Sequence, residues 1–309
     1  MTQKSKPQIW IEYALAKAIL VFLSILPRRA AVAFGFGVAA IGYRVLGKLR
    51  RVGIRSLELA YPDKSEVDRT ALLKGSFKSL GRTLGVVGGF GNVSRENIGD
   101  LIECDFDAEF EAEFAKAREE KRGMIVLTGH LGNWELFALA YSMFFEPSNL
   151  LSRKMDNPLI DEMVTKLRSS FGNRQIDKVN SAGPILRILR SGGTVGILAD
   201  VNSHPKEGVF VPFFGIDACT TAGVAMLALR ANALIVPMFA VWNEEKGRYS
   251  MINEKIIEPI DTGNRKADIE RVTAEFTAAI ERVVRKYPDQ WNWIHRRWKT
   301  RPPGEMELY

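Results

Sequence analysis

Short apolar runs alternate along the chain with longer stretches in which apolar residues recur at helical spacing. The strongest runs, at residues 124–128, 194–200 and 233–242, are rich enough in apolar and β-branched residues for strands buried on both faces. Amphipathic helical patterns separate them, above all over residues 157–171 and 183–190. This order predicts an α/β fold, in which helices flank a mixed but largely parallel central sheet.

The apolar segments of the N-terminal part are longer than the strand-like runs. Residues 9–26 are almost wholly apolar and close to the shortest length that crosses a bilayer, although Lys17 lies near their centre. A second apolar stretch, residues 30–43, ends in a cluster of arginines and lysines. Two apolar segments closed by cations are typical of a membrane anchor that faces an anionic leaflet. We therefore expect an anchor over residues 1–50 and one larger domain over residues 51–309.

Two other interpretations of the N-terminal part remain open. Residues 9–26 could belong to a signal peptide cleaved after Ala31-Val32-Ala33, although the two arginines just before that site argue against cleavage. The two apolar segments could also be buried helices with a solvated basic face.

The strand at residues 124–128 leads into a distinctive stretch, Gly-His-Leu-Gly-Asn-Trp-Glu. On one regular helix His130 and Glu135, five residues apart, would point about 140° away from each other. If a helix begins with Asn133 as its N-cap, His130 lies in the loop before it and Glu135 in its first turn. The two side chains can then converge.

Such a pair suits general-base chemistry. A helix N-terminus favours the neutral form of an imidazole, and a carboxylate on its other ring nitrogen would fix the tautomer. The free N–H groups at the start of the helix, at Asn133 and Trp134, could hold an oxyanion. The spacing fits equally well a histidine that caps a helix and a glutamate that favours the helix dipole.

The same residues resemble a known family. His-Leu-Gly-Asn-Trp-Glu, from His130 to Glu135, matches the H-x4-[DE] motif of the glycerolipid acyltransferase superfamily, and its flanks resemble the lipid A late acyltransferases, the lauroyl and myristoyl transferases. The resemblance implies a glycerol-3-phosphate acyltransferase-like fold. It implies that His130 deprotonates an acceptor hydroxyl, which attacks an acyl thioester, while Glu135 orients His130. No cofactor and no metal are implied.

Later blocks extend the resemblance over most of the chain. Ser-Arg-Lys-Met-Asp-Asn-Pro resembles the block whose arginine, here Arg153, helps to bind the acceptor or its phosphate; from the residues alone Arg153 is a solvated charge at a strand end. Asp200 ends a predicted strand at the edge where α/β sheets place functional groups. Residues 207–215 match a further block and suit a loop lining an apolar channel, although three phenylalanines are more often simply core. The substrate-binding residues expected from these blocks are Arg153, Asp200, Gly208, Phe210, Pro212, Phe213 and Phe214.

The net charge of the chain indicates which kinds of molecule it could bind. The chain has 43 Lys and Arg against 36 Asp and Glu, a net charge of +7, which favours a polyanionic partner. The cations are spread along the chain rather than gathered in a nucleic-acid motif, and the Trp- and Arg-rich ending at residues 288–304 suits a membrane interface or phosphate binding. Two cysteines form no disulfide framework, and the three histidines have no zinc-ligand spacing.

Together these features and the resemblance predict a membrane-attached acyltransferase whose catalytic domain lies on the cytoplasmic side of the inner membrane. The resemblance implies transfer of a fatty acyl group from acyl carrier protein, with coenzyme A as the other possible donor, to a hydroxyl of a phosphorylated lipid A precursor. An acidic carrier and a phosphorylated acceptor would account for the positive charge, and nucleic acid is not expected.

Other functions remain open. Related enzymes with the same motif acylate other glycolipids or lysophospholipids, such as phosphatidylinositol mannosides. From another class, the protein could be a non-enzymatic, membrane-bound polyanion-binding protein. A serine hydrolase is disfavoured, because no Gly-x-Ser-x-Gly elbow is present.

Overall fold

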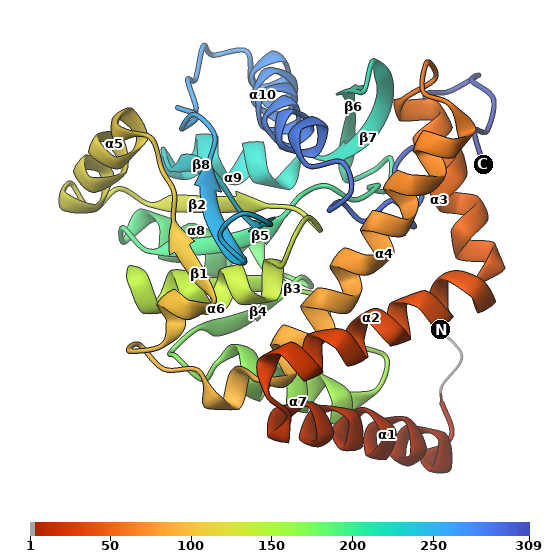
Figure 1. Ribbon diagram of the computed structural model, residues 1–309. Helices are drawn as coiled ribbons and strands as arrows, with labels where there is room; N and C mark the ends of the chain where they lie inside the picture. Colours follow the sequence, from red (N-terminus) through yellow and green to blue (C-terminus); the bar gives the residue numbers. More distant parts are fainter. Residues whose placement is uncertain (1–3) are drawn as a thin grey trace.

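The computed structural model describes residues 4–309 (Figure 1). The strands of its main sheet are β1 (Ile102–Cys104), β2 (Met124–Thr128), β3 (Asn149–Ser152), β4 (Arg174–Asp177), β5 (Thr194–Leu198), β8 (Leu234–Asn243) and β9 (Arg248–Asn253). Their order across the sheet is β1-β9-β8-β2-β5-β3-β4. Every neighbouring pair is parallel except β8 and β9. The predicted mixed, largely parallel sheet is confirmed.

Strand β2 lies in the middle of this sheet and is buried on both faces. Ile125 and Leu127 belong to one apolar cluster, whereas Met124 and Val126 belong to another, because successive side chains of a strand point to opposite faces. The helices on the first face are α8 (Ala182–Arg190), α9 (Gly223–Ala231) and α10 (Arg265–Lys286), and those on the second are α5 (Ala108–Glu119) and α6 (Trp134–Phe144). Burial on both sides explains why the β2 sequence is continuously apolar.

The expectation of a loop at residues 207–215 is wrong. Strand β6 (Gly208–Phe213) pairs antiparallel with β7 (Ile216–Thr221) in a separate two-stranded hairpin. Its two-residue turn has φ values of 54° at Phe214 and 74° at Gly215, the left-handed backbone that tight hairpins require. Pro212 obscured the strand in the sequence, but a proline is tolerated here because β6 is an edge strand.

The N-terminal part forms a helical layer of its own. It contains α1 (Lys6–Ile25), α2 (Arg28–Val45), α3 (Gly47–Ala60) and α4 (Glu66–Gly88), followed by the short 3₁₀ helices η1 (Phe90–Asn92) and η2 (Ile98–Asp100). Helices α2 and α4 touch backbone to backbone, since a Cβ on Gly35 would lie 2.0 Å from the carbonyl oxygen of Gly81. Figure 1 shows α1 at the lower edge of the molecule, beside α7 (Pro158–Arg168). The domain boundary expected at residue 50 falls inside α3.

Helix α1 is, among residues 4–309, the one straight helix long and apolar enough to cross a membrane. Helices α2 and α3 pass the same test only as a pair, and that pair is bent by 88°. The predicted apolar N-terminal helix is therefore present.

Candidate active site

The loop between β2 and α6 carries His130 at the carboxyl edge of the sheet. Helix α6 begins after Asn133, whose side-chain oxygen accepts a hydrogen bond from the Leu136 N–H at 2.9 Å. This N-cap confirms the helix start predicted from the sequence and leaves His130 in the preceding loop.

His130 is bound to Asp200, which follows β5. The Nδ1 atom of His130 lies 2.8 Å from Oδ1 of Asp200, and the backbone N–H of His130 donates to Oδ2 at 2.7 Å. Strands β2 and β5 are parallel neighbours, so their following loops meet at one edge of the sheet. An ionised carboxylate can only accept, so Nδ1 carries the ring proton and Nε2 keeps the lone pair. This is the tautomer that a general base needs.

A third donor to Asp200 comes from the C-terminal segment. The indole N–H of Trp291 donates to Oδ2 of Asp200 at 2.8 Å, in a fully buried position. The backbone around Trp291 also holds the histidine loop, since the Gly132 N–H donates to the Gln290 carbonyl and the Asn292 N–H to the His130 carbonyl. The segment therefore fixes both members of the pair.

The charges of this pair support each other. Burial alone would lower the pKa of His130, but the charge and hydrogen bond of Asp200, helped by Glu135, raise it above its ordinary value. Burial alone would raise the pKa of Asp200, yet the charge and hydrogen bonds of His130 hold it below its usual range. The stable form of the pair is thus a carboxylate beside an imidazole that readily takes a proton.

Two further basic side chains, His295 and Arg297, influence Asp200. The ring of His295 packs 5.0 Å from that of Trp291, and burial lowers the pKa of His295. Arg297 is 1% exposed and donates to the Cys219 carbonyl at 3.0 Å and to the Thr220 hydroxyl; burial lowers its pKa to about 10.

Glu135 does not bind His130 as expected. It receives a two-pronged ion pair from Arg168 at the end of α7, with Nε of Arg168 2.8 Å from Oε2 of Glu135. From the first turn of α6 the glutamate side chain reaches α7, whereas the imidazole turns back towards β5. The hydrogen bond expected between Glu135 and His130 is therefore made by Asp200, and Glu135 acts on His130 only through its charge.

The expected oxyanion donors also differ from each other. The Asn133 N–H already donates to the Ala240 carbonyl at 3.0 Å, so it is not free to bind a substrate oxygen. The Trp134 N–H has no protein acceptor among residues 4–309, as expected at the first position of a helix. The indole ring of Trp134 lies 5.0 Å from the ring of His130, so the side chain at this first helical position packs against the imidazole.

The expected substrate-binding residues are not gathered at His130. Arg153 lies beyond β3, is 63% exposed along its side chain and pairs with Asp156 at 2.8 Å. Asp200 is buried behind His130, which makes it a partner of the histidine rather than of a substrate. The remaining residues, Gly208, Phe210, Pro212, Phe213 and Phe214, all belong to the β6–β7 hairpin.

The hairpin phenylalanines pack into an aromatic core. Phe213 is 1% exposed and lies 5.5 Å from the Trp291 ring, while Phe214 is 7% exposed and packs on Trp293. Trp291, Trp293 and Trp298 are themselves fully buried, so these tryptophans do not form the membrane interface that the closing segment suggested. Flat indoles are large apolar surfaces, and here they support the catalytic loop from behind.

Two residues of this site escaped the sequence analysis. Arg168 looked like an ordinary cation at a helix end, and Trp291 like one of several tryptophans in the closing segment. The only signal for Trp291 was its place in the Trp- and Arg-rich ending at residues 288–304, which gave no reason to connect it with a carboxylate 91 residues earlier.

The fold and this site are those of an α/β enzyme with a histidine–carboxylate pair at the carboxyl edge of its sheet. A model of the family described as bacterial lipid A biosynthesis acyltransferase matches residues 1–300, and the chain belongs to this family. It is an acyltransferase of lipid A biosynthesis, which confirms the resemblance seen in the sequence.

Three relatives from Escherichia coli (strain K12) illustrate the similarity. The chain is 28% identical to a lipid A biosynthesis lauroyltransferase, over 98% of this chain and 96% of the relative. It is 26% identical to a palmitoleoyltransferase, over 97% and 92%, and 24% identical to a myristoyltransferase, over 85% and 80%. The relatives differ in the acyl group that their names give.

Proposed function

We propose that this enzyme moves a fatty acyl group from acyl carrier protein to a hydroxyl of a phosphorylated lipid A precursor, with His130 as the general base. The observation that carries the proposal is the His130–Asp200 hydrogen bond, because it leaves Nε2 of a part-exposed imidazole as the basic atom. The relatives named for lauroyl, palmitoleoyl and myristoyl transfer support the acyl group as the unit transferred.

The proposed reaction uses the imidazole of His130, the N–H of Trp134 and the carboxylate of Asp200. Nε2 of His130 takes the proton of the acceptor hydroxyl as its oxygen forms a bond to the thioester carbonyl carbon. The carbonyl oxygen becomes an oxyanion, which the free Trp134 N–H at the start of α6 stabilises. The C–S bond then breaks, and the leaving thiolate takes the proton from the imidazolium. Asp200 stabilises the imidazolium between these steps, which makes it a positioning residue.

The donor is proposed from charge. The chain carries a net charge of +7, which would attract an acidic carrier protein to its surface. Arg153, exposed at the end of β3, remains the proposed contact for a phosphate of the acceptor.

Attachment to the bilayer is proposed through α1 and α2, with α1 lying in the membrane surface. Asn157 donates to the Ile9 carbonyl near one end of α1 at 2.9 Å, and Asn92 donates to the Ser24 carbonyl near the other end at 3.0 Å. A helix held to the catalytic domain at both ends does not cross a bilayer unless these contacts break. Its outer face carries apolar side chains such as Ile11 and Leu15, 69% and 62% exposed, which suits shallow insertion on the cytoplasmic side.

The test is transfer by the purified full-length protein, read by mass spectrometry of the lipid product. Acyl carrier protein and coenzyme A thioesters compete as donors, and a lipid A precursor, a phosphatidylinositol mannoside and a lysophospholipid compete as acceptors. We expect preference for the carrier protein and the lipid A precursor, and transfer slower by about 10²-fold or more with His130→Ala. Equal product from His130→Ala would overturn the proposal.

A further inference from the structure

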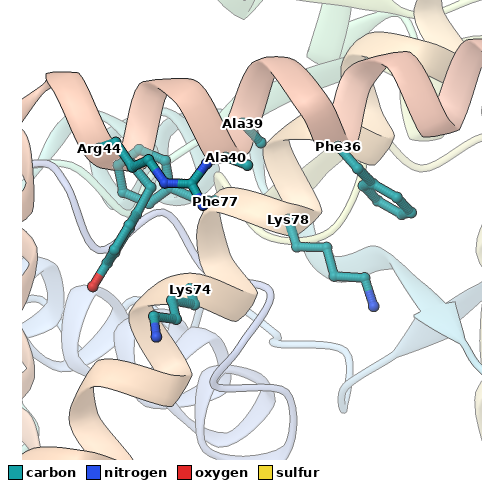
Figure 2. Close-up of a pocket in the computed structure, with 8 residues that line it drawn as sticks. Phe36, Ala39, Ala40, Arg44, Lys74, Phe77 and Lys78 are labelled. Carbon is teal, nitrogen blue, oxygen red and sulfur yellow. The ribbon is translucent and has the colours of Figure 1, made fainter.

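A cavity of about 400 Å³ lies between α2 and α4, away from the catalytic loop (Figure 2). The two helices touch at Gly35 and Gly81, where neither has a side chain. Further along α2 the residues that face α4 include Ala39 and Ala40, whose methyl groups leave the space beside Phe77 unfilled. The volume is within the range of small-ligand sites, about 300–1,000 Å³.

The rim of this cavity is cationic. Figure 2 shows Arg44 projecting from α2, and Lys74 and Lys78 from α4, around the apolar floor. None of these three cations makes an ion pair within residues 4–309. Glu244, whose pKa is influenced by Lys78, is instead 3.2 Å from Arg82. Lys74 and Lys78 lie over the rings of Tyr43 and Phe36, 5.9 and 5.3 Å from the centroids. An apolar floor under three cations without an ion-pair partner is complementary to a lipid phosphate and its first methylene groups.

The position of the cavity on α4 decides which lipid fits it. Ser76 and Thr83 face the catalytic side, because their hydroxyls donate to the carbonyls of Trp291 and Gly132. Lys74 and Lys78 are each two residues from Ser76, about 200° around the helix, so they lie on its opposite side. An acceptor bound there would have α4 between itself and His130. A phospholipid of the bilayer does not have to reach His130, so it can bind on this side of α4.

The cavity also continues an apolar surface. Beyond it on α2, Ile41 is 60% exposed and Val45 is 69% exposed, so α2, through which attachment is proposed, also presents apolar side chains to the bilayer. A chain leaving the cavity along this face would remain in hydrocarbon, while its phosphate stays at the cationic rim.

We propose that the cavity between α2 and α4 binds one anionic phospholipid of the bilayer, with its phosphate on Arg44, Lys74 and Lys78 and its acyl chain over Ala40 and Phe77. The site goes beyond the proposed reaction and rests on the proposed attachment of α1 and α2. It would fix the depth and rotation of the enzyme at an anionic leaflet, and thereby the height of His130 above it.

The experiment measures binding of soluble dihexanoylphosphatidylglycerol to the full-length protein in neutral detergent by native mass spectrometry. Dihexanoylphosphatidylcholine has the same chains without net charge. We expect one saturable phosphatidylglycerol per chain and binding of phosphatidylcholine at least tenfold weaker. Ala40→Trp fills the cavity without changing charge and should abolish binding, whereas Ile41→Trp places the same side chain just outside and should not.

Charge is tested separately. Lys74→Gln with Lys78→Gln should weaken phosphatidylglycerol binding about 25-fold, since each cation near an anionic lipid contributes about a factor of five. The control pair, Lys121→Gln with Lys206→Gln, removes the same charge from exposed sites elsewhere and should leave binding unchanged.

Three results would overturn the proposal. Ala40→Trp could bind phosphatidylglycerol as Ile41→Trp does, or the two lysine pairs could have equal effects. A lipid A precursor could also displace the phospholipid one for one, with Ala40→Trp losing acyl transfer in detergent, which would make the cavity an acceptor site. The proposed reaction is judged independently, because His130→Ala should retain the lipid and Ala40→Trp should retain transfer.

Discussion

In most proteins charged side chains are exposed and large apolar ones are buried. The region around His130 and the helix pair α1–α2 depart from this rule in opposite ways. The region around His130 places a carboxylate, Asp200, where 1% of it is exposed, whereas α1 places Ile11 and Leu15 where more than 60% of each is exposed. Asp200 is stable inside because His130 donates twice to it and Trp291 once. Within residues 4–309 nothing covers the outer face of α1, and such an exposed apolar face fits the proposed contact with the bilayer.

The comparison shows how each region can be damaged. A buried ionised group depends on every one of its partners, and losing one partner leaves an unpaired charge or donor. The affinity of an exposed apolar face for a membrane depends on its total apolar area, so each lost side chain lowers that affinity by a limited amount. Changes near His130 should therefore alter the chemistry sharply, and changes on α1 should alter location while leaving the chemistry alone.

The largest expected effect comes from His130→Ala. Removing the base should lower kcat/KM for acyl transfer by about 10²–10⁴-fold. The fold should persist, because His130 is part-exposed and its backbone bonds remain. Transfer rates together with a thermal unfolding midpoint measure both. Near-normal turnover by a folded variant would contradict the proposed mechanism.

Asp200→Asn and Glu135→Gln separate the two carboxylates. Asn can turn its amide N–H₂ to Nδ1 of His130 and favour the wrong tautomer, so we expect a loss of about 10²-fold or more in kcat. Glu135→Gln should cost about tenfold or less, since its partner is Arg168. Double-mutant cycles should couple Asp200 to His130 and Glu135 to Arg168. Stronger coupling of Glu135 than of Asp200 to His130 would restore the role expected from the sequence.

On the apolar side of the comparison, Leu15→Asp should reduce partition to anionic vesicles by about tenfold or more, because burying a leucine is worth about 1.5–3 kcal/mol. Val67→Asp is the matched control: Val67 is 78% exposed in the first turn of α4, away from α1. Sedimentation with vesicles reports both variants. Transfer to a detergent-dispersed acceptor should be normal in each, and equal release of the two variants would contradict attachment through α1.

The smallest expected effect is a shift in pH dependence. The base must be neutral, so kcat/KM should fall as the pH drops through the raised pKa of His130, with a midpoint above the ordinary 6.5. Trp291→Phe removes one donor from Asp200, which leaves more of the carboxylate's charge for His130 and should move this midpoint further up. Glu135, Arg168, His295 and Arg297, the other charges around the pair, are unchanged by this substitution.

Trp293→Phe is the control for that shift. Trp293 is equally buried and donates its indole N–H to the Pro288 carbonyl rather than to Asp200. Both variants should lose similar thermal stability, but only Trp291→Phe should change the pH profile. A shift of equal size in both would mean that Trp291 acts through packing alone.

Local pattern was enough for several features of this enzyme. The apolar β2 run, the helix start after Asn133, the position of His130 in the loop between them and the apolar N-terminal helix all followed from neighbouring residues. Periodicity and capping are short-range properties, so they can be seen within one or two turns of chain.

Which groups meet was decided by the tertiary fold. Asp200 reaches His130 because β5 pairs with β2, and Trp291 reaches Asp200 because the C-terminal segment runs past the loop. The H-x4-E spacing made Glu135 the obvious partner, yet Arg168 on α7 holds it elsewhere. Strand order and helix docking depend on how whole faces bury their apolar area. A local pattern can therefore identify a candidate base, but the carboxylate that binds it is selected by contacts between segments distant in the chain.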